Sequence, residues 1–184
     1  MQKFWERLYQ TNLKWDENSA YLINKFNKRI VLLRKVATFC NDERELTQIY
    51  ITFCRVILEQ SCVLWSSTLT EENKVDLERC QKVALKIILG NKYKNYDDAL
   101  KYLNMESLSD RREDLVLRWA KKALNHDKIK DLFPLNKKVH SMEMRKGEKY
   151  QIKNTHTERL RKSSIFYMQK ILNEDESDRD QMNG

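Results

Sequence analysis

The stretch LEQSCVLWSSTLTEENKVDLERCQKVALKIILG, residues 58–90, contains the start and stop signals of a helical hairpin. Its first residues continue an apolar helix, and a turn rich in Ser and Thr follows Trp65. Thr70 is placed to cap the next helix, whose apolar residues recur every three or four positions. Gly90 ends that helix, because glycine readily adopts the left-handed conformation of a helix C-terminus. The stretch predicts two packed helices with Trp65 at their junction.

The whole chain has the composition of a mainly helical protein. Its 184 residues include 3 Gly and 1 Pro, too few for many tight turns, and 34% of the residues are charged. The hydrophobic fraction of 41% is sufficient for a core. These values predict an all-α fold, a bundle of antiparallel helices.

Two further helices are predicted upstream of the hairpin's turn. A long amphipathic helix follows the polar residues 16–19, and a capping box of Asp42 with Glu45 opens a second helix. This second helix is apolar nearly all round, so it is expected to lie at the centre of the core. Four residues of these helices and of the hairpin are expected to be core residues: Phe53, Trp65, Leu77 and Ile88.

Changes in composition divide the chain. Asn95 and then Ser107 or Ser109 open further helices, and a lysine-rich stretch with few apolar residues follows Pro134. A second capping box, Thr155 with Glu158, opens the last helix. The resulting division is a lead-in segment at 1–17, a helical domain at 18–135, a basic, partly disordered linker at 136–154, a C-terminal helix at 155–172 and an acidic, disordered tail at 173–184.

The net charge of +8 indicates a polyanionic partner such as nucleic acid, although a lysine-rich, solvated surface is the simpler interpretation. Clustered cations bind phosphates with little base preference, because the binding energy comes largely from counterion release. Ten basic residues are candidate nucleic-acid contacts: Lys25, Lys28, Arg29 and Lys35 on the first helix, Lys82 and Lys86 on the helix after Thr70, and Arg145, Lys149, Arg161 and Lys162 toward the C-terminus.

The sequence gives no support for an enzyme. Asp97–Asp98, the one adjacent pair of aspartates, is predicted near a helix start, whereas two-metal polymerase chemistry needs carboxylates held together by a rigid scaffold. No catalytic residue, metal, cofactor or small-molecule substrate is expected. No apolar run approaches the roughly 20 residues of a membrane span. The cysteines lack zinc-site spacing and are expected to be reduced in an intracellular, cytoplasmic or nuclear protein: Cys40, Cys54, Cys62 and Cys80.

Several segments resemble the thumb of reverse transcriptases from non-LTR (LINE-type) retrotransposons. LKWDENSAYLINKFNKRIVLLRKV at 13–36, IYITFCRVILEQSCVLW at 49–65 and LERCQKVALKIILG at 77–90 are similar to the family's thumb helices. SLSDRREDLVLRWAKKALNHDKIKDLFP at 107–134 and TERLRKSSIFYMQKILN at 157–173 resemble the helical segments that follow.

The resemblance implies a thumb and connection-like fragment of an RNA-directed DNA polymerase. Such a region holds the RNA/DNA template–primer by contacts to the nucleic-acid backbone. The resemblance also implies a polymerase palm as a partner in a larger protein. The paired catalytic aspartates of the family's palm have no counterpart in this sequence, so the expected function is binding without chemistry. The alternatives are a helical protein-interaction or structural module, and a degenerate element remnant without selected function.

Overall fold

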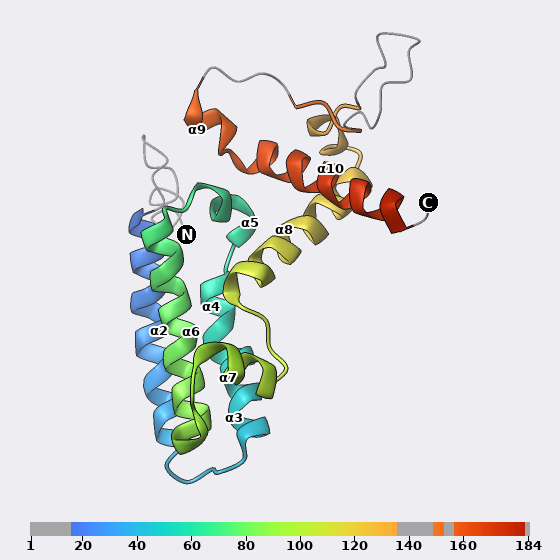
Figure 1. Cartoon of the computed structure of the whole chain (residues 1–184). Coiled ribbons are helices and arrows are strands. Elements are labelled where there is room, and N and C mark those ends of the chain that lie inside the picture. Colours follow the sequence, from blue (N-terminus) through green and yellow to red (C-terminus); the bar gives the residue numbers. More distant parts are fainter. Residues whose placement is uncertain (1–15, 136–148, 153–156, 183–184) are drawn as a thin grey trace. The chain divides into compact units, whose positions relative to one another are not determined.

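The computed structural model describes residues 16–135, 149–152 and 157–182 (Figure 1). Within these ranges the chain is all-α, and its only strand-like feature is an isolated bridge between Leu135 and Tyr150. The predicted all-α class is therefore confirmed. The predicted antiparallel arrangement holds only in part, because the helices at 16–36 and 71–89 run in the same direction (Figure 1). None of the described helices combines the length and the apolar character needed to cross a membrane.

The chain folds as two compact units, whereas the sequence predicted one domain ending at 135. The first unit comprises residues 1–62 and 69–112, and the second comprises 63–68 and 113–184. The described elements of the first unit are α2 (Asp16–Val36), α3 (Glu43–Ile49), the π-helix η1 (Tyr50–Arg55), α4 (Val56–Glu59), α6 (Glu71–Leu89), the 3₁₀ turn η3 (Gly90–Lys92) and α7 (Tyr96–Tyr102). α5 (Cys62–Trp65) and α8 (Leu108–Leu124) pass from one unit into the other. The second unit also contains the 3₁₀ turns η2 (Ser66–Thr68) and η4 (Lys130–Leu132), α9 (Glu158–Arg161) and α10 (Ser164–Met182).

α2 and α6 form the framework of the first unit. They lie side by side and run in the same direction, while α3 and α4 run the opposite way (Figure 1). The Ser19 hydroxyl donates to Asn73 Oδ1 at 2.9 Å and so fixes the two N-terminal turns together. The inward face of α2 follows the predicted spacing, with Leu22, Phe26, Ile30 and Leu33 buried.

The predicted second helix is interrupted. α3 gives way to a π-helical turn over 50–55, and Ser61, with a φ of 56°, separates α4 from α5. The wide turn buries Tyr50 and Cys54 but leaves Phe53 39% exposed. The prediction that Phe53 is a core residue is therefore wrong. Arg29 Nη1 donates to the Phe53 carbonyl at 2.7 Å and supplies a partner for the backbone of this irregular turn.

The other core predictions and most of the caps are confirmed. Trp65, Leu77 and Ile88 are buried. The side chains of Thr70 and Asn95 cap α6 and α7, and Ser107, rather than Ser109, caps α8. Gly90 ends α6 as predicted, with a φ of +50° and a ψ of −121°, a conformation that favours glycine but is not the left-handed helical one that was expected. Asp42 caps α3 as predicted, but the Glu45 carboxylate accepts from the Cys40 thiol at 3.3 Å, so only the Asp42 half of the capping box is seen.

A buried polar network ties the elements of the first unit together around Gln81, which is fully buried. The Tyr50 hydroxyl donates to Gln81 Oε1 at 2.8 Å. Gln81 Nε2 donates to the Tyr96 hydroxyl at 3.1 Å and to the Glu106 carbonyl at 2.8 Å. Tyr96 in turn donates to Glu78 at 2.5 Å. The network fixes the positions of η1, α6, α7 and the segment before α8 relative to one another.

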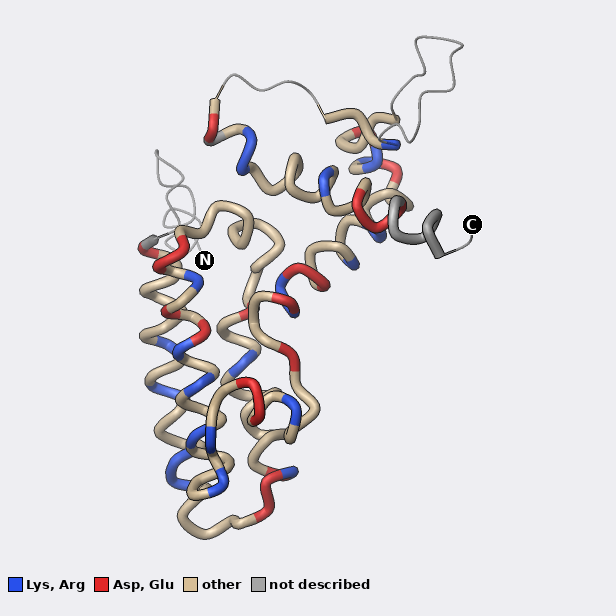
Figure 2. Tube along the Cα trace, viewed as in Figure 1, with Lys and Arg blue, Asp and Glu red and all other residues tan. Residues whose placement is uncertain are grey.

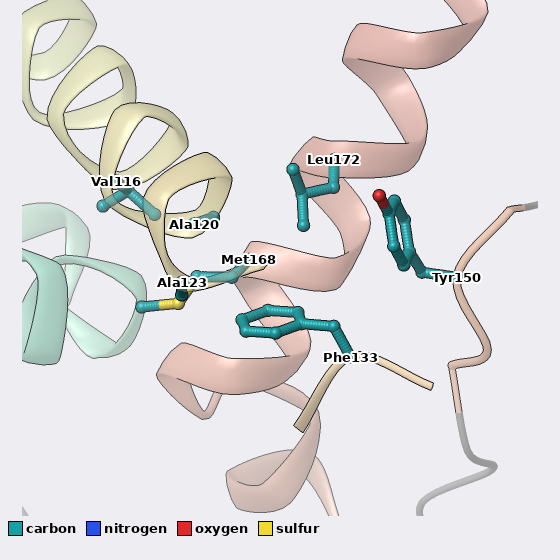
Figure 3. Close-up of a cluster of buried hydrophobic side chains, with 7 residues drawn as sticks. All are labelled: Val116, Ala120, Ala123, Phe133, Tyr150, Met168 and Leu172. Carbon is teal, nitrogen blue, oxygen red and sulfur yellow. The ribbon is translucent and has the colours of Figure 1, made fainter. Parts of the chain in front are cut away.

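The second unit has its own hydrophobic core (Figure 3). Phe133 and Tyr150 approach α8 and α10 from segments that have no helix of their own. The Gln151 N–H donates to the Pro134 carbonyl at 2.8 Å, beside the Leu135–Tyr150 bridge. The buried side chains of this core are Val116, Ala120, Ala123, Phe133, Tyr150, Met168 and Leu172.

The C-terminal boundaries also differ from the prediction. Thr157 caps α9, α10 continues to Met182, and residues 173–182 are therefore helical rather than a disordered tail. Acidic side chains expected in solvent are paired instead, Asp175 with Lys121 at 2.8 Å and Glu176 with Lys149 at 2.9 Å. The predicted linker at 136–154 and the cap Thr155 lie largely outside the described residues. Its described part, 149–152, is anchored because Tyr150 is buried.

Candidate nucleic-acid interface

Positive charge gathers along the C-terminal halves of α2 and α6. Residues 18–41 contain five basic residues and no acidic one, and the same is true of residues 79–96. The acidic residues of both helices lie nearer their starts, as the coloured trace of Figure 2 shows. Because the two helices run in parallel, their basic halves lie at the same end of the first unit.

The register of the two helices follows from the contact between Ser19 and Asn73. Both helices rise about 1.5 Å per residue, so Lys28 is level with Lys82. The structure thus brings together, along the helix axes, two of the clusters predicted from the sequence. We call these exposed or half-buried cations the basic end: Lys28, Arg34 and Lys35 of α2, and Lys82 and Lys86 of α6.

The predicted contacts on α2 differ in how available they are. Arg29 is half-buried, and its guanidinium carbon lies 4.5 Å from the centre of the Phe53 ring. Lys25 lies over the ring of Tyr21 at 4.7 Å. Lys28 and Lys35 are exposed, and neither has an ion-pair or hydrogen-bond partner for its ammonium group in the part of the chain that the structure describes. These two lysines are the freest of the predicted α2 contacts.

The α6 lysines lie over aromatic rings of the following segment. Lys82 Nζ is 4.9 Å from the centre of the Tyr96 ring, and Lys86 Nζ is 5.4 Å from that of Tyr93. Arg29 is directed toward η1, whereas Lys82 is directed toward α7. The basic residues of α2 and of α6 therefore lie at the same end of the first unit, but those of α2 lie beside η1 and those of α6 beside α7.

The cations predicted toward the C-terminus are mostly neutralised. Lys149 pairs with Glu176 at 2.9 Å, and Glu158 pairs with Arg161 at 3.5 Å and with Lys162 at 3.3 Å. Arg145 lies outside the described residues. The second unit is thus a weaker candidate for phosphate contacts than the basic end.

Sequence reasoning left Arg34 out of the candidate contacts. Arg34 is exposed in the last turn of α2, next to Lys35, and belongs to the same acid-free run. Lys92 lies in the other acid-free run, but its ammonium pairs with Glu43 at 2.7 Å, which raises the pKa of Lys92 and lowers that of Glu43. The absence of acids along each run is the sequence signal that identifies Arg34.

The aspartate pair shows no polymerase-like geometry. Asp97 and Asp98 are exposed in the first turn of α7, and Asp98 accepts a hydrogen bond from the Asn95 side chain at 2.7 Å. Within the described ranges, no cluster of three or more His, Cys, Asp or Glu side chains is suited to hold a metal ion.

Comparisons with protein-family models, with curated proteins and with solved structures find no match to this chain.

Proposed function

We propose that this chain binds nucleic acid through the sugar–phosphate backbone, as a non-catalytic, thumb-like fragment of a LINE-type reverse transcriptase. The observation that carries the proposal is the parallel pairing of α2 and α6, which places two acid-free runs of cations at one end of the first unit. Exposed Lys and Arg side chains meet phosphates and position a duplex without specifying its sequence. The resemblance of residues 13–36 and 77–90 to thumb helices supports a template–primer duplex as the partner.

The test is the salt dependence of binding, measured by fluorescence anisotropy with a labelled RNA–DNA hybrid and with a DNA duplex. Lys28, Arg34, Lys35 and Lys86 are changed together to Gln. Each phosphate contact contributes about 0.9 to the slope of log K against log salt for B-form DNA, so the DNA slope should flatten by up to about 3 to 4.

A matched control removes four cations that pair with acids on their own helices or turns and lie outside the two acid-free runs: Lys74, Arg118, Lys130 and Lys170, each changed to Gln. Net charge falls equally in both variants, so a difference between them reports position rather than total charge. Equal slopes for the two variants would refute the basic end as the interface. Absence of binding at low salt would refute the proposed function.

The second candidate function is a helical protein-interaction module. It is favoured by apolar side chains that stay exposed on α2 and η1, Leu32 at 45% and Phe53 at 39%, beside the half-buried Arg29. A protein partner that packs on these side chains would bind with weak salt dependence, because apolar burial is not screened. Loss of that binding in Leu32→Ser, with nucleic-acid binding unchanged, would favour this alternative.

A further inference from the structure

A pocket of about 790 Å³ opens in the first unit, beside η1 and α7. Its size falls within the range of pockets that hold small organic ligands. Its lining combines an apolar wall with two arginines: Ile51, Leu100, Leu103 and Met105 form the wall, and Arg55 and Arg111 supply the charge.

The two arginines share one carboxylate oxygen. Arg111 Nε donates to Glu59 Oε1, and Arg55 Nε lies 3.3 Å from the same atom. The Arg55 Nε lacks hydrogen-bond geometry toward any partner, although Arg55 is 91% buried. The terminal amino groups of both guanidinium groups make no hydrogen bond to the described residues.

The inner part of this pocket carries one excess positive charge, which the exposed Glu106 of the lining offsets in part. Arg55 and Arg111 contribute two positive charges, and Glu59 contributes one negative charge. Burial lowers the pKa of Arg55 and the charge of Arg111 lowers it further, whereas Glu59, Tyr50 and Glu106 raise it. Since a buried charge without enough counter-charge is costly, a bound anion would relieve the site.

We propose that the pocket binds the carboxylate of an apolar acid, with its two oxygens on Arg55 and Arg111 and its apolar body against Leu100, Leu103 and Met105. A planar carboxylate matches the donor geometry of guanidinium groups. A single negative charge balances the excess charge of the two arginines over Glu59.

The exposed charges of the pocket disfavour a more highly charged ligand. Asp97, Glu106 and Lys101 line it and are exposed, and together they carry one net negative charge. A phosphate monoester, with its charge of about −1.5 to −2 at neutral pH, would be repelled by these acids after the arginines were neutralised.

The experiment compares N-acetyl-leucine with N-acetyl-leucinamide, which has the same apolar body without the charge. Binding to the full chain is followed through the backbone amide resonances of residues 100–106. We expect saturable shifts with the acid and at least about 10-fold weaker binding of the amide, because hydrogen bonds to a charged group are lost. Inorganic phosphate is the third probe and is expected to leave these resonances unchanged at constant ionic strength.

Three variants locate the site. Arg111→Gln should weaken binding of N-acetyl-leucine by at least about 10-fold. Arg79→Gln removes an arginine of an exposed ion pair in the same unit and should leave binding unchanged. Leu103→Trp keeps both arginines but fills the pocket, so it should abolish the shifts while the circular dichroism spectrum stays native; it decides the question if Arg111→Gln fails to fold.

Four results would overturn the proposal. They are equal binding of the acid and the amide, saturable shifts with phosphate but not with the acid, an equal loss in Arg79→Gln and Arg111→Gln, and no saturable shift of the wild-type chain with N-acetyl-leucine. None of these results depends on nucleic-acid binding at the basic end, so either proposal can be refuted without the other.

Discussion

The side-chain amide of Asn173 bonds both backbone polar groups of Tyr150. The Tyr150 N–H donates to Asn173 Oδ1 at 2.9 Å, and Asn173 Nδ2 donates to the Tyr150 carbonyl at 3.1 Å. Both residues are buried, so this amide satisfies backbone groups that water cannot reach. Together with the Lys149–Glu176 ion pair and the packing of the Tyr150 ring, it joins the described segment 149–152 to α10.

Asn173→Ala should destabilise the second unit by about 2–5 kcal/mol, because two buried backbone groups lose their partner. Hydrogen exchange of the Tyr150 amide measures the effect directly. An Ala variant whose Tyr150 amide exchanges at the wild-type rate would show that the segment is held by other contacts.

Gln81→Leu should destabilise the first unit by about 2–4 kcal/mol at nearly constant volume, because the Tyr50 hydroxyl and the Glu106 carbonyl lose their partner. Tyr50→Phe removes one of these orphaned groups. The double variant should therefore be less destabilised than the sum of the two single variants, by about 1 kcal/mol or more. Urea unfolding of the wild type, the two single variants and the double variant measures this coupling as a double-mutant cycle. Strictly additive effects on the free energy of unfolding would contradict the network.

Trp65→Ala should lower the free energy of unfolding by about 3–5 kcal/mol, because the indole is 1% exposed and its removal leaves a large cavity. Leu64 is 48% exposed, and Leu64→Ala is the matched control, with an expected effect within about 0.5 kcal/mol. Circular dichroism across a urea series measures both. A wild-type midpoint in Trp65→Ala would mean that the indole is not part of the core.

Stability should fall with rising pH above about 9, partly through Cys80. Burial, and then the charge of Asp76, raise the pKa of the Cys80 thiol from 9.0 to about 12. Between these values the unfolded chain has lost the thiol proton and the folded chain has kept it, so stability is full below pH 9 and is lost as pH rises toward 12. Cys80→Ala should reduce the slope by at most about 1.4 kcal/mol per pH unit.

Urea midpoints at pH 8, 9 and 10 measure that slope. If Cys80→Ala and wild type lose stability equally with pH, the Cys80 thiol does not contribute to the alkaline loss.

The elements predicted well were those whose signals are local. Thr70, Asn95 and Ser107 cap helices through hydrogen bonds to residues three positions away, and Gly90 needs only its own positive φ. Such features depend on short stretches of chain, so periodicity and cap residues suffice to predict them.

The failures came from contacts distant in sequence. By composition, residues 173–182 resemble a solvated acidic tail. In the structure α10 continues through them, and Asp175 pairs with Lys121, which lies 54 positions away in the sequence. The π-helical turn of η1, and with it the exposure of Phe53, depends on packing against α2. The same holds for the candidate sites: acid-free runs marked the basic end, but the sharing of Glu59 by Arg55 and Arg111 has no signal in the spacing of these residues.

The parallel course of α2 and α6 also aligns their macrodipoles. Each helix C-terminus carries roughly half a negative charge on its free carbonyl groups, so the end that gathers Lys35 and Lys86 also presents two partial negative charges. A phosphate that approached along the helix axes would meet those carbonyl groups together with the ammonium groups. One that approached from the side would meet the ammonium groups alone. A nucleic-acid strand on this unit should therefore lie across the flanks of the two helices rather than over their ends.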